Sequence, residues 1–261
     1  MQPVCLITGA SAGIGMALAH VFAKHGHALV LTARREAELQ ALADEIATAG
    51  FARPHVITAD LGAPEGPGLL AGALLAASLE PSIVVNNAGF GLLGEVADLD
   101  RNRQLAMIDL NIRALTDLSL RWLEPITRHR GGILNVASVA GFFPGPGMAI
   151  YNASKAYVIS FTEALHEELK ADGVRVCALC PGPVETEFFE RAGIPDDYFP
   201  NFLNRSAERV ARDGYNGFMA GHRMVVPGKP NRMATLLPRL FSRGLILAAA
   251  GWRRDRALRR G

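Results

Sequence analysis

Short apolar runs alternate along this chain with segments in which apolar residues recur at helical spacing. The runs have the length of buried strands and lie at residues 4–7, 28–33, 55–59, 82–85, 133–137 and 174–180. The segments between them predict helices from residue 14, over 36–49 and 64–79, from residue 99 and over 151–171. This alternation predicts an α/β fold: a single doubly wound parallel sheet of the Rossmann type, with helices on both faces in an αβα arrangement.

The apolar pattern also divides the chain into two parts. A chain of 261 residues, 49% of them apolar, suits one large domain, which we place at residues 1–229. A helical extension is expected over 230–261, with an apolar stripe broken by Pro238, an apolar segment at 244–252 and a basic segment at 253–260. The apolar part is too short and too interrupted by arginines to span a bilayer. Three placements stay open for it: an anionic membrane surface, its own domain, or a subunit contact.

Charge and cysteine content narrow the class of protein. The net charge is +2, with seven arginines against Asp255 in residues 239–261 and a net acidic remainder, so no nucleic-acid partner is expected. The N-terminus has no secretory signal pattern, and three cysteines without a disulfide framework fit a reducing compartment, so a cytoplasmic protein is expected. Cys177 and Cys180 lie three apart on a predicted strand and face opposite sides, which favours buried thiols over a metal or redox pair. No metal site is expected.

A glycine-rich turn joins the first predicted strand to the first predicted helix. Glycines let the backbone approach a diphosphate, and a helix N-terminus supplies unpaired N–H groups and a favourable dipole. In this context the spacing Gly-x-x-x-Gly-x-Gly predicts a dinucleotide site, with a tight structural turn as the alternative. The residues expected to bind the cofactor here are Thr8, Gly9, Ser11, Gly13, Ile14 and Gly15.

The second predicted strand ends in Arg34 and Arg35, where an acidic residue would hold the ribose 2′-hydroxyl of NAD(H). Two guanidinium groups would instead bind a 2′-phosphate. The cofactor predicted from these residues is therefore NADP(H). The alternative is that Arg35 only pairs with Glu36 or Glu38 at the start of the next helix.

Tyr151 and Lys155 are four residues apart, and therefore lie on one face of the predicted helix. A phenol has an ordinary pKa of about 10, and a nearby ammonium group would lower that pKa towards the working range. Ser138 ends the preceding predicted strand, so its hydroxyl can converge with the phenol at the rim of the sheet. Because Tyr-x-x-x-Lys also occurs by chance, a surface lysine beside a half-buried tyrosine is the alternative.

Taken together, these motifs resemble the short-chain dehydrogenase/reductase superfamily over roughly residues 3 to 228, and the extension is similar to that of poorly characterised bacterial short-chain oxidoreductases. The motifs that carry the resemblance are Thr8-Gly-x-x-x-Gly-Ile-Gly, Asn86-Asn-Ala-Gly, Ser138, Tyr151-x-x-x-Lys155 and Pro181-Gly182. The resemblance implies a parallel Rossmann-type sheet and hydride transfer to or from a nicotinamide cofactor.

Roles for individual residues also follow from the resemblance. It makes Tyr151 the general acid for carbonyl reduction and Ser138 a hydrogen-bond donor to the substrate oxygen. Lys155 would lower the Tyr151 pKa and hold the nicotinamide ribose, and Asn111 would anchor a water that relays protons. The further residues it places on the cofactor are Asp60, Leu61, Asn87, Ala88, Gly89, Pro181, Gly182, Val184 and Thr186.

The expected function is that of an NADP(H)-dependent oxidoreductase acting on a carbonyl or secondary alcohol, assembled as a homodimer or homotetramer. A long loop at 187–204 carries five aromatic residues, and Phe142 and Phe143 are expected opposite it, which favours an apolar ketone or aldehyde. Ordinary packing of this loop on its own domain is the alternative. Two other functions stay open: a dinucleotide-binding sensor or scaffold without turnover, and a membrane-surface reductase of a lipid pathway, of the 3-oxoacyl or steroid type.

Overall fold

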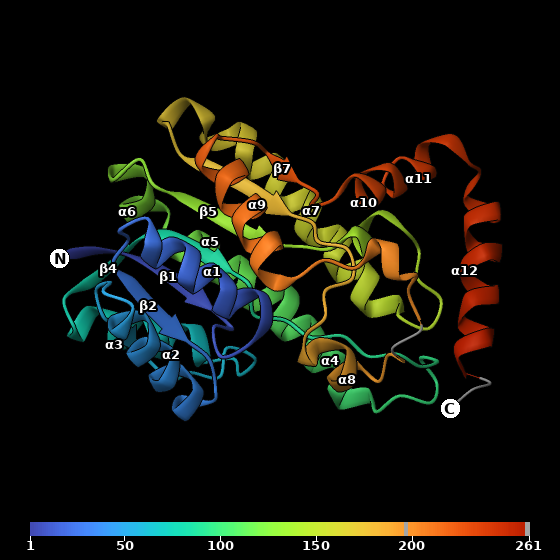
Figure 1. Cartoon of the computed structure of the whole chain (residues 1–261), viewed down its shortest axis with the longest axis horizontal. Coiled ribbons are helices and arrows are strands. Elements are labelled where there is room, and N and C mark those ends of the chain that lie inside the picture. Colours follow the sequence, from blue (N-terminus) through green and yellow to red (C-terminus); the bar gives the residue numbers. More distant parts are fainter. Residues whose placement is uncertain (196–197, 259–261) are drawn as a thin grey trace.

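The computed structural model describes residues 1–195 and 198–258, with side chains up to Trp252. The basic segment of residues 253–260 therefore lies outside the described side chains. Figure 1 shows one sheet with helices packed around it and the C-terminal helices at the opposite end from the N-terminus.

The sheet has seven strands in the order β3-β2-β1-β4-β5-β6-β7, and every neighbouring pair is parallel. The order reverses between β1 and β4. Strands β2 and β3 follow one another on one side of β1, and β4 to β7 follow one another on the other side. In such sheets the ligand site lies at this reversal, beyond the carboxyl ends of the strands. The strands are β1 (Gln2–Thr8), β2 (Leu29–Thr32), β3 (His55–Val56), β4 (Leu79–Asn86), β5 (Gly132–Val136), β6 (Arg175–Leu179) and β7 (Met224–Val225).

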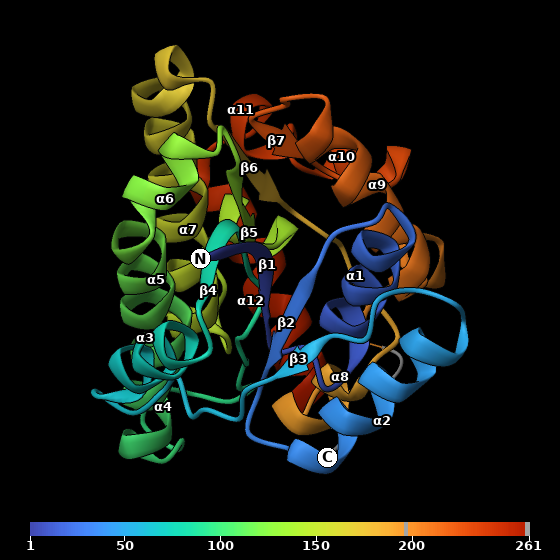
Figure 2. The ribbon, with the colours of Figure 1, turned by 90° about the vertical axis from the view of Figure 1, so that its left-hand side faces the viewer.

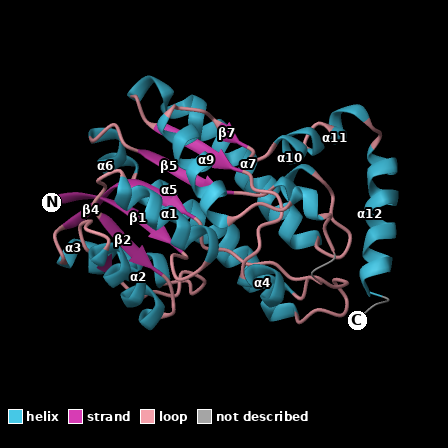
Figure 3. Cartoon of the chain, viewed as in Figure 1, coloured by secondary structure: helices cyan, strands magenta, loops and turns pink. Residues whose placement is uncertain are grey.

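Helices cover both faces of the sheet, as Figures 2 and 3 show. Alternate residues of β1 explain why: Cys5 and Ile7 belong to one buried cluster, and Val4 and Leu6 belong to the other. The first cluster includes α1 (Gly13–Lys24), α2 (Glu36–Thr48) and α9 (Ala207–Met219). The second includes α3 (Gly66–Ala76), α5 (Leu115–Arg121), α6 (Leu123–Arg128) and α7 (Ala149–Leu169). The predicted doubly wound sheet is therefore confirmed.

Several predicted boundaries were wrong. The helix predicted over 64–79 ends at Ala76 because β4 begins at Leu79, after a turn in which Ser78 has a φ of 57°. The predicted third strand shortens to β3, although the backbone N–H of Ala59 still donates to the carbonyl of Ala33. Strand β7 was not predicted from the sequence.

The helix predicted from residue 99 is divided into segments. Helix α4 (Arg101–Ile108) passes into a π-helical turn, Asp109–Ala114, and then into α5; α6 is separate, because Trp122 breaks from helical backbone geometry. Apolar spacing alone did not predict this turn, since a π-helical residue changes the register by one position without changing composition.

The C-terminal part begins after β7 and contains three helices, α10 (Lys229–Ala234), α11 (Leu237–Leu240) and α12 (Arg243–Leu258). In Figure 1, α12 stands across the end of the molecule to which the strands point, joined to it through α10 and α11. The loop after β6 holds α8 (Glu187–Ala192) and a short turn, Asn201–Leu203. Within the described part of the chain, every helix is too short or too polar to cross a membrane.

The three cysteines are free and buried, as predicted. Cys177 belongs to the cluster on one face of the sheet, and Cys180 belongs to the cluster that packs against α7 on the other. Burial raises the pKa of the Cys177 thiol to about 12, so it is an apolar packing group rather than a nucleophile.

A buried string of polar side chains crosses the sheet between β4, β5 and α7. Asn86 Nδ2 donates to Asn135 Oδ1 (2.8 Å) and to Ser119 Oγ (3.0 Å), and Asn135 Nδ2 donates to Thr162 Oγ1 (2.9 Å). Asn135 is fully buried, so each of these groups depends on its protein partner.

We predict that Asn135→Leu lowers the free energy of unfolding by about 1–3 kcal/mol, because it leaves an Asn86 N–H buried without its acceptor. Denaturant unfolding measures this change. Adding Asn86→Leu should restore part of the lost stability, because it removes the N–H group that lost its acceptor. It also removes Asn86 Oδ1, which has no partner among the described residues. A single variant as stable as the parent protein would contradict the prediction.

Candidate functional site

A cavity of about 1990 Å³ opens at the carboxyl ends of the strands, where the order of the sheet reverses. It is lined by the segments that follow β1, β4, β5 and β6, represented by Gly9, Asn87, Ser138 and Pro181. The predicted site residues line this cavity with three exceptions, which are Thr8, Gly15 and Asn111. All three lie directly behind the wall and support it.

The glycine turn gives the cavity its inner end. Gly9 and Gly13 adopt φ values of 64° and 56°, in the left-handed region that favours glycine. A Cβ on Gly15 would lie 2.3 Å from the carbonyl oxygen of Gly9, so only glycine allows α1 to begin this close to β1. Ala12 precedes α1 and has no side chain that could cap it, so the first turn of α1 has no side-chain cap; Gly13 and Ile14 of this turn line the cavity.

Thr8 joins the two strands on either side of the reversal. Its hydroxyl donates to the carbonyl of Val85 (3.2 Å) and accepts from the backbone N–H groups of Asn87 (2.9 Å) and Ala88 (3.0 Å). Asn87 Nδ2 donates back to the carbonyls of Thr8 and Gly9, at 2.9 and 3.1 Å. The Thr8 hydroxyl is therefore used within the protein, and it fixes the loop after β4 against the glycine turn.

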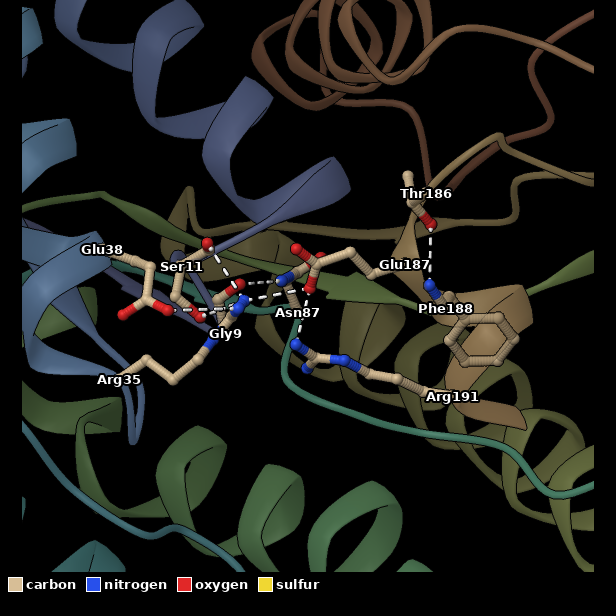
Figure 4. Close-up of polar contacts among 9 residues, drawn as sticks. All are labelled: Gly9, Ser11, Arg35, Glu38, Asn87, Thr186, Glu187, Phe188 and Arg191. Carbon is tan, nitrogen blue, oxygen red and sulfur yellow. Dashed lines mark hydrogen bonds and ion pairs between the residues drawn. The ribbon is translucent and has the colours of Figure 1, made fainter. Parts of the chain in front are cut away.

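The two arginines after β2 have different surroundings. Arg35 Nη2 donates to Ser11 (3.2 Å to its carbonyl and 3.3 Å to its Oγ) and to Glu187 Oε2 (3.2 Å), as Figure 4 shows. Its Nη1 also lies 3.3 Å from Glu38 Oε1, so the expected alternative pairing exists for Glu38. Arg34 lines the cavity with an exposed side chain. Arg35 is thus paired with Glu187 and Glu38, while Arg34 is an exposed residue of the cavity wall.

Asp60 and Leu61 form the wall beyond β3. Asp60 Oδ1 accepts a hydrogen bond from the backbone N–H of Gly62 (3.0 Å), which closes a turn, and Leu61 is buried in the second cluster. Both residues also line the cavity, on the same side as Arg34. Their backbone therefore shapes this end of the cavity.

Ser138 and Tyr151 meet at the cavity wall. Ser138 follows β5 and its Oγ accepts from the N–H of Ala140 (3.1 Å), while Tyr151 projects from the first turn of α7. Both are buried, at 8% exposure. Burial raises the pKa of Tyr151 to about 12, and a hydrogen bond with Ser138 opposes that rise. The phenol is therefore held in its protonated form.

Lys155 lies one turn further along α7, beneath the tyrosine. Its Nζ donates to the carbonyl of Val136 (2.7 Å) and lies 5.8 Å from the centre of the Tyr151 ring. Burial lowers the pKa of Lys155 to about 8. That Lys155 lowers the Tyr151 pKa stays a prediction. In this structure its ammonium group bonds to the carbonyl of Val136, and the hydrogen bond that lowers the Tyr151 pKa comes from Ser138.

Asn111 occupies the π-helical turn and is almost fully buried, at 1% exposure. Its amide accepts from the N–H of Phe90 (3.1 Å) and donates to the carbonyl of Phe90 (3.0 Å) and to Ser154 Oγ (3.1 Å). A Cβ on Gly89 would lie 2.9 Å from Asn111 Oδ1 and 3.6 Å from Lys155 Nζ, so these groups share one small space. Asn111 thus fixes the loop after β4 onto α7, in a π-helical turn of the kind that often marks functional sites.

The segment after β6 closes the other side of the cavity. The carbonyl of Pro181 accepts from the N–H of Val139 (2.9 Å), which ties this segment to the Ser138 loop. Thr186 caps α8 by accepting from the N–H of Phe188 (3.3 Å), as Figure 4 shows. A Cβ on Gly13 would lie 3.0 Å from Thr186 Cγ2, so the glycine turn and the start of α8 are in close contact.

A large part of the cavity wall was not predicted from the sequence. Phe188 of α8 packs on Tyr151, with ring centres 5.5 Å apart, which confirms that an aromatic residue of the 187–204 loop is at the site. The C-terminal helices also line the cavity, and none of their residues was predicted there. The apolar stripe of residues 233–241 was the available signal, but it did not indicate which surface the stripe would face. The lining residues from α11 and α12 include Leu237, Leu240, Leu245, Ile246, Ala249 and Trp252.

The groups at the inner end of the cavity fit a dinucleotide. The open N-terminus of α1 offers N–H donors for a diphosphate, Arg34 offers a guanidinium at the end of β2, and Lys155 offers a buried amine next to Tyr151. Gly9 and Gly13 add no side-chain atoms to the wall at this end.

Known proteins are similar to this chain in sequence and in fold. A family described as short chain dehydrogenase matches residues 3–195. Sulfoacetaldehyde reductase 2 of Chromohalobacter salexigens is 39% identical over 191 residues, which are 72% of this chain and 75% of that protein.

Solved structures are similar over a larger share of the chain. A short-chain dehydrogenase from Sphingobium yanoikuyae in complex with NADPH has a TM-score of 0.80 at 33% identity, covering 93% of this chain and 94% of its own. A bulky-bulky ketone specific alcohol dehydrogenase from Comamonas testosteroni has a TM-score of 0.75 at 27% identity, covering 92% and 93%. Other similar structures hold NADP⁺ or NADH. The chain therefore belongs to the short-chain dehydrogenase family, oxidoreductases whose fold binds a nicotinamide dinucleotide.

Proposed function

We propose that this protein is an NADP(H)-dependent oxidoreductase that interconverts an apolar ketone or aldehyde with its alcohol. The observation that carries the proposal is the placement of Ser138, Tyr151 and Lys155 on one wall of a cavity whose inner end fits a dinucleotide. When bound, the cofactor supplies or accepts the hydride.

The protein's own residues supply the proton that the reaction needs. In the direction of reduction, the Tyr151 hydroxyl donates its proton to the carbonyl oxygen as the hydride reaches the carbonyl carbon. The Ser138 hydroxyl donates a hydrogen bond to the same oxygen as negative charge develops there. A Tyr151 pKa of about 12 suits the acid role, because the phenol stays protonated at neutral pH. Lys155 and Asn111 fix α7 and the loop after β4 around this phenol.

Preference for NADP(H) rests on Arg34. Arg35 already faces two carboxylates, Glu38 and Glu187, so its charge is largely compensated. Arg34 is exposed on the cavity wall after β2, where we expect the 2′-phosphate to bind, and a guanidinium binds phosphate in bidentate geometry. The NADPH bound by the similar Sphingobium yanoikuyae enzyme supports this choice, although another similar structure holds NADH.

An apolar substrate is supported by the aromatic wall of the cavity, which includes Phe143, Phe188 and Phe199. The name of the Comamonas testosteroni enzyme, which is specific for bulky ketones, agrees with it. The alternative of a sensor without turnover has no observation in its favour, because a sensor needs no hydroxyl pair such as Ser138 and Tyr151 at its ligand. A homodimer or homotetramer in the cytoplasm stays a prediction.

We predict that Tyr151→Phe lowers kcat for ketone reduction by about 100-fold to 10,000-fold, because it removes the proton donor. Binding of NADPH, followed by quenching of protein fluorescence, should remain. Tyr157→Phe is the control: Tyr157 is also on α7, but its hydroxyl bonds to Thr116 on the protein surface. Equal activity of Tyr151→Phe and Tyr157→Phe would rule out the proposed chemistry.

Arg34→Asp should weaken NADPH binding roughly 10-fold to 150-fold, because hydrogen bonds to a charged phosphate are lost. Binding of NADH should change little, since NADH carries no 2′-phosphate. Dissociation constants for both cofactors measure the effect, and Arg53→Asp is the charge-matched control on an exposed site. Equal weakening for NADPH and NADH would show that Arg34 does not bind the phosphate.

For alcohol oxidation, Tyr151 must act as the base, so kcat/KM should rise with pH towards the raised pKa of Tyr151, about 12. The Ser138 hydrogen bond lowers that pKa, so Ser138→Ala should raise it and move the ascending limb to higher pH. The pH profile of kcat/KM tests this independently of the overall loss of rate. A limb that stays in place, or moves to lower pH, would contradict the assigned hydrogen bond.

A further inference from the structure

The C-terminal extension forms the outer wall of the same cavity that holds Tyr151. Residues of α10, α11 and α12 line it together with the aromatic residues of the loop after β6. Figure 1 shows these helices arranged around the end of the molecule to which the strands point. The extension is therefore part of the site.

The start of the extension is fixed to the cofactor end of the cavity. Asn231 is buried, at 1% exposure, and its Nδ2 donates to the carbonyls of Leu203 and Pro227, both at 3.1 Å. A Cβ on Gly182 would lie 2.4 Å from the Asn231 amide, so the loop after β6 and α10 are in direct contact. This contact sets where α11 and α12 begin relative to Tyr151.

The outer wall is apolar and open. Leu240 and Leu245 line the cavity with 73% and 62% of their surface exposed, and Trp252 with 65%. Among the described lining residues that follow Leu203 in the sequence, Asn231 is the one with an amide or charged side chain. Its amide already donates hydrogen bonds within the protein. Apolar side chains that stay exposed within a concave surface are typical of a site for an apolar ligand.

The volume of the cavity also indicates that it holds a second molecule besides the cofactor. Its volume is about 1990 Å³, while sites for single small ligands usually measure roughly 300–1,000 Å³. The polar inner end takes the dinucleotide, which leaves the region between α8 and α12 for a second molecule of considerable size.

We infer that the substrate is a long or bulky hydrocarbon with its carbonyl at Tyr151 and its apolar body lying along α11 and α12. This inference rests on the proposed function and adds the substrate class and the residues that select it. Leu240 and Leu245 act as specificity residues: they contact the apolar body and do not touch the reacting atoms. A membrane surface is the competing use of this wall, and the experiment separates the two.

The test measures kcat/KM with NADPH for 2-butanone, 2-octanone and 2-tetradecanone in the full-length protein. If the apolar body is buried, kcat/KM should rise with chain length, by at most about fourfold for each added methylene. Leu240→Gln combined with Leu245→Gln should lower kcat/KM for 2-tetradecanone about tenfold and leave 2-butanone unchanged. Because both side chains are exposed, the variant should fold normally.

The matched control is Leu69→Gln combined with Leu75→Gln, which changes two leucines of similar exposure, 67% and 66%, on α3 away from the cavity. In this control variant, kcat/KM should depend on the length of the ketone as it does in the parent protein. Three results would overturn the inference: rates in the parent protein that do not depend on chain length, equal effects of the two double variants, or an effect of Leu240 and Leu245 seen only in binding to lipid vesicles. Failure to reduce even 2-butanone, with NADPH still bound, would instead contradict the proposed function.

Discussion

Burial of the Tyr151 phenol is the constraint on which the rest of the site depends. The end of β5 places Ser138, the first turn of α7 places Tyr151, and Phe188 of α8 covers the ring. Removing water raises the pKa of the phenol to about 12 and leaves Ser138 as its polar partner. A buried, protonated phenol is suited to giving a proton to a carbonyl oxygen. The parallel sheet makes this possible, because its strand ends bring residues distant in sequence to one rim.

The cavity combines two chemical environments in one space. Its inner end is lined by glycines, backbone N–H groups and Arg34, which suit a charged dinucleotide. Its outer end is lined by aromatic and aliphatic side chains from the loop after β6 and from the C-terminal helices. Tyr151 lies where the two meet. Gly182 and Asn231 connect the ends, since their close packing joins the cofactor loop to the extension.

Local sequence patterns predicted most of the sheet and the lining of its inner end. Glycine spacing, the residues after each apolar run and the Tyr151–Lys155 pair are all short-range signals that a sequence carries directly. What could not be predicted depends on contacts between distant segments. Lys155 was expected to act on the phenol, but its partner is the carbonyl of Val136, on the neighbouring strand. The extension was predicted to be apolar, but its place at the cavity depends on contacts with distant segments, such as that of Asn231 with Gly182.

The most direct test of this account is the ionisation of Tyr151 itself, followed by NMR of protein labelled with ¹³C at the tyrosine Cζ. Tyr151→Phe assigns the resonance among the four tyrosines of the chain. The structure predicts that Tyr151 stays protonated through neutral and mildly alkaline pH and titrates only near its raised pKa of about 12. A phenolate that forms near neutral pH would contradict the claim that burial raises the pKa of Tyr151 and keeps its hydroxyl protonated.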